Sequence, residues 1–228
     1  MIADQEWGIA FDWDGTLMQA RRADGIERFG KLASHFGLPF GIEIKEKVKL
    51  LWGRPAEELI GECWPHADVH AFKSLWSHLD LADPRPLISG VTQMLAALHP
   101  NFSLVVITAR DRSIHPLLHH FRLDGLFEFI LHADNCPIKK PHPGCENTLI
   151  ERFDKIGVRK EHIILVGDSI EGDTVVALRA GFTFFGVTWG WNTREDFINI
   201  GIPDADICDS VPELIKALYM KVAGIKPR

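Results

Sequence analysis

Short apolar runs alternate with amphipathic stretches from about residue 86 to the end of the sequence. Strands that alternate with helices predict a parallel sheet covered by helices on both faces. Right-handed crossovers between such strands give an α/β fold with a three-layer, Rossmann-like core. The predicted strands are Ser103–Ile107, Glu128–Leu131, His162–Val166 and Thr183–Val187. The predicted helices are Ser89–His99, Ser113–Phe121, Pro143–Ile156, Thr174–Ala180 and Val211–Val222.

The first apolar run, Gly8–Trp13, is followed by helical patterns instead of a second strand. We therefore expect a small α-helical cap domain, residues 18–85, inserted after the first strand of a core made of residues 1–17 and 86–228. Two prolines stiffen the segment Asp83–Pro86, which is the expected hinge where the chain returns to the core. The predicted helices of the insert are Gly25–Phe36, Ile42–Trp52, Ala56–Cys63 and Val69–Leu79.

Three tryptophans of the insert, Trp52, Trp64 and Trp76, recur every 12 residues. Gly53 and Pro65 interrupt any continuous helical face between them, so the spacing does not indicate a repeat. We expect the three rings to pack in a small apolar core of the insert.

Composition narrows the possible partners. The chain has 228 residues, a net charge of -6 and 46% hydrophobic residues, which is typical of a globular protein and argues against a broad nucleic-acid surface. The first residues lack the basic region and apolar core of a signal peptide, and no apolar run approaches the about 20 residues that span a bilayer. The four cysteines form no Cys-x-x-Cys pair, as expected for free thiols in a reducing cytosol. We expect a cytoplasmic monomer or homodimer without nucleic-acid or membrane partners.

The first polar cluster directly follows the first predicted strand. Strand alternation puts Asp12 and Asp14 on one side and Trp13 on the other, and Gly15 allows a sharp turn before Thr16. Two carboxylates this close favour a divalent cation. A helix–loop–helix calcium site is a poor alternative, because it needs a glutamate near position 23, where this chain has alanine.

Three further clusters follow later strands, and the carboxyl ends of parallel strands share one sheet edge where ligands bind. Thr108 and the amides after it can hold phosphate oxygens, and Lys140 can neutralise phosphate charge from a loop. Asp168 and Asp173 can complete an oxygen-rich magnesium site. Taken singly, each cluster has a simple structural interpretation: a strand-end hydroxyl, a solvated lysine pair or a helix cap.

Taken together, in this order, the clusters resemble the haloacid dehalogenase superfamily. Its pattern is Asp-x-Asp-x-Thr, a strand-terminal Thr or Ser, a Lys, and Gly-Asp followed by a second acid. The resemblance spans essentially the whole chain, and the insert looks like the cap of the phosphoglycolate-phosphatase-like branch. The segment Gly186–Asn192 resembles the Gly-Tyr-Asn turn of that branch. One departure is Met18-Gln19-Ala20, where the branch usually continues with Asp-Ser, so phosphoglycolate is not assumed as the substrate.

The resemblance implies a magnesium-dependent phosphatase that hydrolyses a small-molecule phosphate monoester through a phospho-aspartate. It implies Asp12 as the nucleophile and Asp14 as the general acid/base. Thr108 and Lys140 would hold the phosphoryl group. The other residues expected near the phosphate are Gly15, Thr16, Ala109 and Arg110. The expected Mg²⁺ ligands are Asp12, Asp14 through its carbonyl, Asp168 and Asp173.

Other readings stay open at this point. A phosphomutase keeps both aspartates, and a non-catalytic binding or regulatory protein can share the scaffold, although no motif residue is missing here. A dehalogenase or phosphonatase is disfavoured, because those branches lack the second aspartate. Arg54, between two predicted helices of the insert, can meet a substrate carboxylate or second phosphate, although a surface arginine beside a turn is the simpler interpretation. His115 and His119 lie one helical turn apart, but without a third ligand they do not predict a zinc site.

Overall fold

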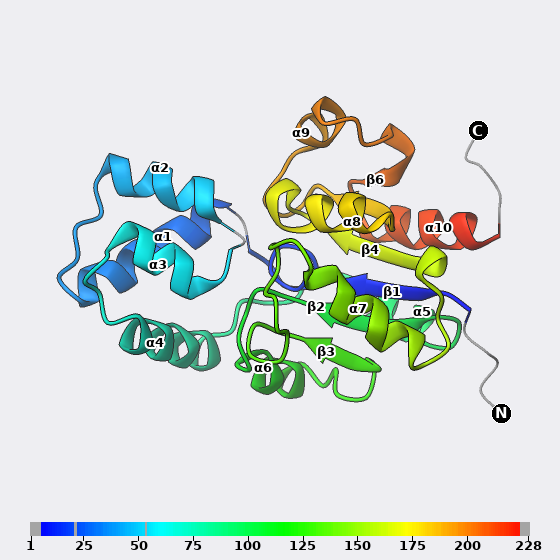
Figure 1. The fold of residues 1–228 in the computed structure, drawn as a ribbon, viewed down its shortest axis with the longest axis horizontal. Coiled ribbons are helices and arrows are strands. Elements are labelled where there is room, and N and C mark those ends of the chain that lie inside the picture. The colour runs from blue at the N-terminus through cyan, green and yellow to red at the C-terminus, as the bar shows by residue number, and fades with distance from the viewer. Residues whose placement is uncertain (1–5, 21, 53, 224–228) are drawn as a thin grey trace.

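A six-stranded parallel sheet forms the centre of the computed structural model, which describes residues 6–20, 22–52 and 54–223 (Figure 1). The strand order is β3-β2-β1-β4-β5-β6, so β1 lies between β2 and β4. Ala10 of β1 is in register with Val105 of β2 and Leu165 of β4. The strands are β1 (Gly8–Phe11), β2 (Ser103–Ile107), β3 (Phe129–Leu131), β4 (Ile163–Gly167), β5 (Thr183–Val187) and β6 (Ile207–Cys208).

Helices cover both faces of the sheet, which explains why every residue of β1, β2 and β4 is buried. Alternate residues of β1 enter different apolar clusters: Ile9 and Phe11 belong to one, and Ala10 to the other. The first cluster includes residues of α5 (Val91–Leu98), α6 (Ile114–His120) and α10 (Val211–Val222). The second includes residues of α7 (Cys145–Asp154), α8 (Val175–Ala180) and α9 (Arg194–Asn199). The predicted α/β fold with a parallel sheet is confirmed.

Four helices between β1 and α5 lie to one side of the sheet, and we call them the cap (Figure 1). The cap has its own apolar cluster, in which Phe29 packs against Trp64, Phe72 and Trp76. Trp52 also packs against this cluster, so the three tryptophans of the insert share one core as predicted. The domain boundaries at residues 17/18 and 85/86 stay predictions. The cap helices are α1 (Arg22–His35), α2 (Ile42–Leu51), α3 (Ala56–Cys63) and α4 (Val69–Ala82).

The two connections between core and cap run side by side. Met18 and Leu87 form an antiparallel bridge, and the Gln19 amide donates to the Pro86 carbonyl at 2.9 Å. The predicted return segment, residues 83–86, lies next to this crossing. The chain therefore leaves and re-enters the core close to the end of β1.

The sequence analysis missed α9 and β6, and the predicted bounds of some helices differ from those observed. The missed elements are α9 and the two-residue strand β6, which is too short to show a period. A single π-helical turn, Ile170–Thr174, also precedes α8. Helix α4 continues to Ala82, past the predicted end at Leu79, and the added turn carries Asp80. No helix among the described residues is both long enough and apolar enough to span a membrane.

Candidate active site

A pocket of about 140 Å³ lies between the carboxyl ends of the central strands and the cap. Its lining combines charged residues of the core with both apolar and charged residues of the cap. The predicted site residues that line it are Asp12, Asp14, Arg54, Thr108, Ala109, Arg110, Lys140, Asp168 and Asp173. The cap and the loop after β5 add Trp52, Ala56, Leu59, Lys73, Trp76, Ser77 and Trp191.

Three buried carboxylates meet at the sheet edge. Asp12, Asp168 and Asp173 each offer an oxygen, and the three oxygens lie within 4.8 Å of one another. The Lys140 ammonium donates to Asp12 Oδ1 at 2.6 Å and is also ion-paired with Asp173. The side chain of Asp14 is not part of this group and lies against two arginines instead. Four side chains that are far apart in the sequence, Asp12, Lys140, Asp168 and Asp173, thus lie together at the sheet edge, as expected from the positions of the predicted strand ends.

The charge of this group is unbalanced. Burial raises the pKa of Asp12 to about 7; Lys140 opposes the rise and Asp173 adds to it. Burial also raises the pKa of Asp168, and repulsion from Asp12 and Asp173 raises it further. Burial alone lowers the pKa of Lys140, but Asp12 and Asp173 outweigh burial and raise it, so the lysine keeps its charge.

Three carboxylates and one ammonium leave excess buried negative charge, which is costly without a counter-ion. A divalent cation among the three oxygens offsets it, and carboxylates with water are the ligands that Mg²⁺ takes. The donor set therefore fits a hard divalent cation.

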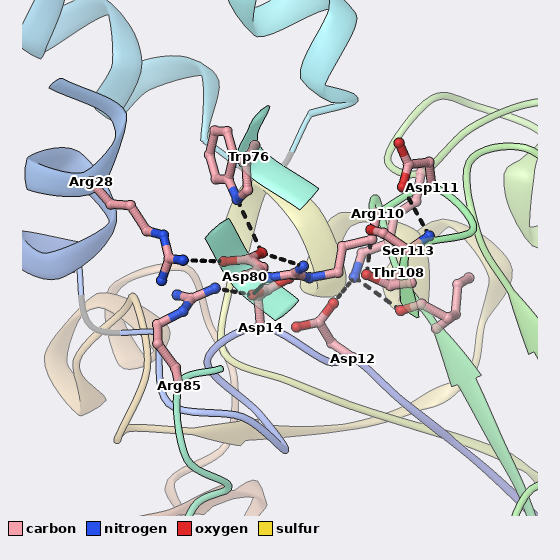
Figure 2. A network of polar contacts seen from close by, with 12 residues as sticks. Asp12, Asp14, Arg28, Trp76, Asp80, Arg85, Thr108, Arg110, Asp111 and Ser113 are labelled. Atoms are coloured by element: carbon pink, nitrogen blue, oxygen red, sulfur yellow. Dashed lines mark hydrogen bonds and ion pairs between the residues drawn. The ribbon is translucent and has the colours of Figure 1, made fainter. Parts of the chain in front are cut away.

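Asp14 is held by two arginines (Figure 2). Arg110 donates from Nε to Oδ2 at 2.5 Å and from Nη2 to Oδ1 at 2.7 Å, and Arg85 donates from Nη2 to Oδ1 at 2.8 Å. Burial raises the pKa of Asp14, but Arg110 and then Arg85 outweigh burial and lower it to about 2. Asp14 is therefore an ionised carboxylate in this arrangement. Arg110, which was predicted to lie near the phosphate, lines the pocket, and its guanidinium is paired with Asp14 and, at 2.6 Å, with Asp80.

Comparison with known proteins identifies the family. The model of the haloacid dehalogenase-like hydrolases matches residues 9–187. The chain belongs to this family. Among curated relatives, the phosphoglycolate phosphatase of Mannheimia succiniciproducens is 31% identical over 81% of this chain and 86% of its own length. That of Vibrio vulnificus is 32% identical over 93% of this chain and 96% of its own length.

Solved structures agree with this assignment. A predicted phosphoglycolate phosphatase from Haemophilus somnus has a TM-score of 0.71 and 26% identity, and the match covers 95% of this chain and 99% of that one. A protein from Lactobacillus delbrueckii, at 18% identity and a TM-score of 0.72, supports the fold alone. The predicted resemblance to the phosphoglycolate-phosphatase-like branch of the haloacid dehalogenase family is confirmed, and the chain is an enzyme of a hydrolase family.

Gly15 and Thr16, predicted beside the phosphate, are placed against Asp168 and do not line the pocket. A Cβ on Gly15 would lie 2.0 Å from Asp168 Oδ2, and one on Gly190 would lie 2.1 Å from the same atom. Gly15 also has a φ of +87°, which disfavours other residues. The Asp168 carboxylate accepts from the Trp191 amide at 2.6 Å and more weakly from the Thr16 hydroxyl at 3.4 Å. The two glycines thus leave the space in which Asp168 reaches the carboxylate group.

The adjacent lysines Lys139 and Lys140, on the loop before α7, have different partners. Lys140 is buried and ion-paired with Asp12, whereas Lys139 is ion-paired with Glu57 of the cap. On the other side of Lys140, His142 Nε2 lies 2.6 Å from Glu58 Oε1, also on α3. Cap helix α3 therefore contacts both flanks of the loop that carries Lys140.

The sequence analysis missed Arg85 and Asp80. Arg85 lies between two prolines in the predicted return segment. Because that segment re-enters the core, its position could have indicated that Arg85 lies near the site. Asp80 lay beyond the predicted end of its helix, and nothing in the sequence marked it. Arg54 lines the pocket edge but is exposed, and the described part of the chain offers its guanidinium no ion pair.

Proposed function

We propose that this family member is a magnesium-dependent phosphatase that hydrolyses a small-molecule phosphate monoester through a phospho-aspartate on Asp12. The relatives named phosphoglycolate phosphatases support a phosphate monoester as the substrate. The observation that carries the proposal is the position of Asp12: it is buried at the end of the central strand, 2.6 Å from Lys140, and shares a cation-sized site with Asp168 and Asp173.

Mg²⁺ would be held by Asp12, Asp168 and the Asp14 carbonyl, with Asp173 beside them. Bound there, the ion supplies positive charge that lowers the repulsion between the Asp12 carboxylate and the phosphate. Lys140 adds a second, permanent positive charge to the phosphoryl site. The Thr108 hydroxyl, which accepts from the Arg110 amide at 3.2 Å, provides a donor to a phosphoryl oxygen.

The chemistry has two steps. An Asp12 oxygen attacks phosphorus, the bond from phosphorus to the leaving oxygen breaks, and Asp14 gives that oxygen a proton. A water oxygen then attacks the same phosphorus while Asp14 takes a proton from the water, and the bond to Asp12 breaks. Inorganic phosphate leaves, Asp12 is again a free carboxylate, and Asp14 again carries its proton. Since two arginines favour the ionised form of Asp14, proton donation requires that the negative charge of the bound phosphate raises the pKa of Asp14 while the arginines keep its orientation.

The pocket volume favours a small substrate. About 140 Å³ is close to the roughly 150 Å³ of an engineered cavity that holds one benzene ring. A phosphoryl group with a short leaving group fits this volume, which favours such a substrate over a larger one such as a nucleotide. Trp52, Leu59 and Trp76 line the cap side, where the leaving group lies.

The test is phosphate release from a panel of phosphate esters, including p-nitrophenyl phosphate and 2-phosphoglycolate, with and without Mg²⁺. We expect turnover only with the metal and its loss in Asp12→Asn. Asp154→Asn, an exposed aspartate on α7, is the matched control and should leave the rate unchanged. Wild-type rates for Asp12→Asn would contradict the proposal. Conversion of a sugar phosphate to an isomer without phosphate release would indicate a phosphomutase.

A further inference from the structure

Asp80 is a buried cap carboxylate that faces the core. It lies in the last turn of α4 and is 2% exposed. Its partners come from three places: Arg28 of α1 forms an ion pair at 3.0 Å, and Trp76 of its own helix and Arg110 of the core donate hydrogen bonds at 3.1 and 2.6 Å (Figure 2). Asp80 does not line the pocket, so it has no route to a substrate except through these partners.

Arg110 links this cap carboxylate to Asp14. Its Nη1 donates to Asp80, while Nε and Nη2 donate to the two oxygens of Asp14 (Figure 2). A guanidinium is planar and rigid, so its donors cannot be aimed independently. If the Nη1 contact with Asp80 is lost, the directions of Nε and Nη2 are no longer fixed. The orientation of Asp14 therefore depends on a cap residue that never touches it.

Both arginines that hold Asp14 depend on how the cap is seated. Arg110 is oriented by Asp80, and Arg85 lies on the segment where the chain returns from the cap. If the cap lifted away from the core, Asp80 would keep Arg28 and Trp76 but lose Arg110. Removing one partner from a buried ion pair is unfavourable. Cap closure and the present orientation of Arg110 thus stabilise each other.

We propose that Asp80 is a positioning residue: by fixing the Arg110 guanidinium when the cap is closed, it sets the orientation in which Asp14 serves the leaving oxygen. The inference rests on the proposed function, in which Asp14 is the general acid. It assigns to a buried cap carboxylate the task of coupling closure to proton transfer.

The diagnostic measurement is the dependence on the leaving group. An alkoxide needs a proton as it departs, whereas p-nitrophenolate leaves as a stable anion. kcat/KM reports on phospho-aspartate formation, the step in which the leaving group departs. Because general acid catalysis contributes about 10²–10⁴-fold, we expect Asp80→Asn to lower kcat/KM for an alkyl phosphate about 10- to 100-fold. For p-nitrophenyl phosphate we expect a change of no more than about 3-fold, because that leaving group does not need the acid.

Three further variants separate positioning from structure. Asp83→Asn changes an exposed aspartate just past the end of the same helix and should leave both substrates unaffected. Arg28→Gln removes the ion-pair partner of Asp80 inside the cap. It should leave the ratio of kcat/KM for the alkyl phosphate to kcat/KM for p-nitrophenyl phosphate as in the wild type. Arg110→Lys keeps the charge but cannot bridge two carboxylates, so it should reproduce the Asp80→Asn pattern even if Asp80→Asn folds poorly.

A double-mutant cycle completes the test. In an Asp14→Asn background, adding Asp80→Asn should cost nothing further, because the group that Asp80 serves is already gone. Equal losses on both substrates, or full additivity with Asp14→Asn, would overturn the inference. A wild-type protein that hydrolyses no phosphate ester would instead sink the proposed function, so the two failures are distinguishable.

Discussion

Trp52, which ends helix α2 of the cap, stacks on Trp191 in the loop after β5, with ring centroids 4.8 Å apart and planes 3° from parallel. The two rings join cap and core at the pocket, which both residues line. The backbone amide of Trp191 also donates to Asp168. The stack therefore connects cap closure to the loop that supports the carboxylate group.

Removing this stack should weaken cap closure more than it weakens the chemistry. An aromatic pair contributes about 0.5–1.5 kcal/mol beyond its buried area, so we expect Trp52→Ala to raise KM up to about 10-fold and to change kcat little. Steady-state kinetics on p-nitrophenyl phosphate measures this. Trp7→Phe is the control, because Trp7 stacks on His162 at the amino ends of β1 and β4, away from the pocket at their carboxyl ends. A kcat loss without a change in KM would contradict this role.

The buried carboxylates predict an unusual response to metal. Asp168 has a raised pKa because burial and two neighbouring carboxylates disfavour its charge, so Asp168→Asn should relieve repulsion in the metal-free protein. We expect metal-free Asp168→Asn to unfold at the same temperature as the metal-free wild type or higher. Mg²⁺ at about 100 times its Kd should stabilise the wild type by about 2.7 kcal/mol and the variant much less. Thermal unfolding with EDTA or Mg²⁺ measures both, and equal stabilisation of the two proteins would argue against Asp168 as a ligand.

The sheet and the meeting of the strand ends could be predicted, because both follow from local patterns. Short, mostly apolar runs such as Ser103–Ile107 mark buried strands, and parallel strands place their final residues on one edge. The pairing of Arg110 with Asp14 and Asp80 could not be predicted, since it depends on how the cap packs against the core. Most site residues that sequence reasoning found follow strand ends, with Lys140 on a loop and Arg54 in the cap as exceptions, whereas those it missed, Asp80 and Arg85, lie at the cap boundary.

Helices α7 and α8 are joined by an ion pair that also supports the Lys140 loop. Arg179 donates to both oxygens of Glu146 at 2.8 and 2.7 Å and to the carbonyls of Pro141 and His142 at 3.2 Å. Burial raises the pKa of Glu146, but Arg179 outweighs burial and lowers it. A lowered pKa means that the pair stabilises the fold above the ordinary glutamate value of about 4.3, and that this contribution is lost as the pH falls through the folded pKa.

We therefore expect Arg179→Gln to lower the free energy of unfolding at pH 7 by about 1–3 kcal/mol, because it leaves a largely buried carboxylate without its partner. The deficit relative to wild type should shrink once the pH is well below 4. Urea denaturation at both pH values measures it. Lys155→Gln, which removes an exposed pair with Glu151, is the control and should cost no more than about 0.5 kcal/mol. A deficit that did not change with pH would count against the ion pair as its source.

Gly190 supplies the sharpest steric test of the carboxylate site. Its Cβ would lie 2.1 Å from Asp168 Oδ2, so Gly190→Ala must displace either the loop or the carboxylate. We expect Mg²⁺ affinity to fall at least about 10-fold, as when a group that orients a ligand is lost, with phosphatase activity falling alongside it.

Gly61→Ala in α3 is the matched substitution, since a Cβ there meets no atom within 4 Å. Because alanine favours a helix interior over glycine by about 1 kcal/mol, Gly61→Ala should stabilise the protein and leave Mg²⁺ binding intact. Calorimetric titration of Mg²⁺ into both variants decides the matter: unchanged affinity in Gly190→Ala would mean that Asp168 does not need its present position to bind the ion.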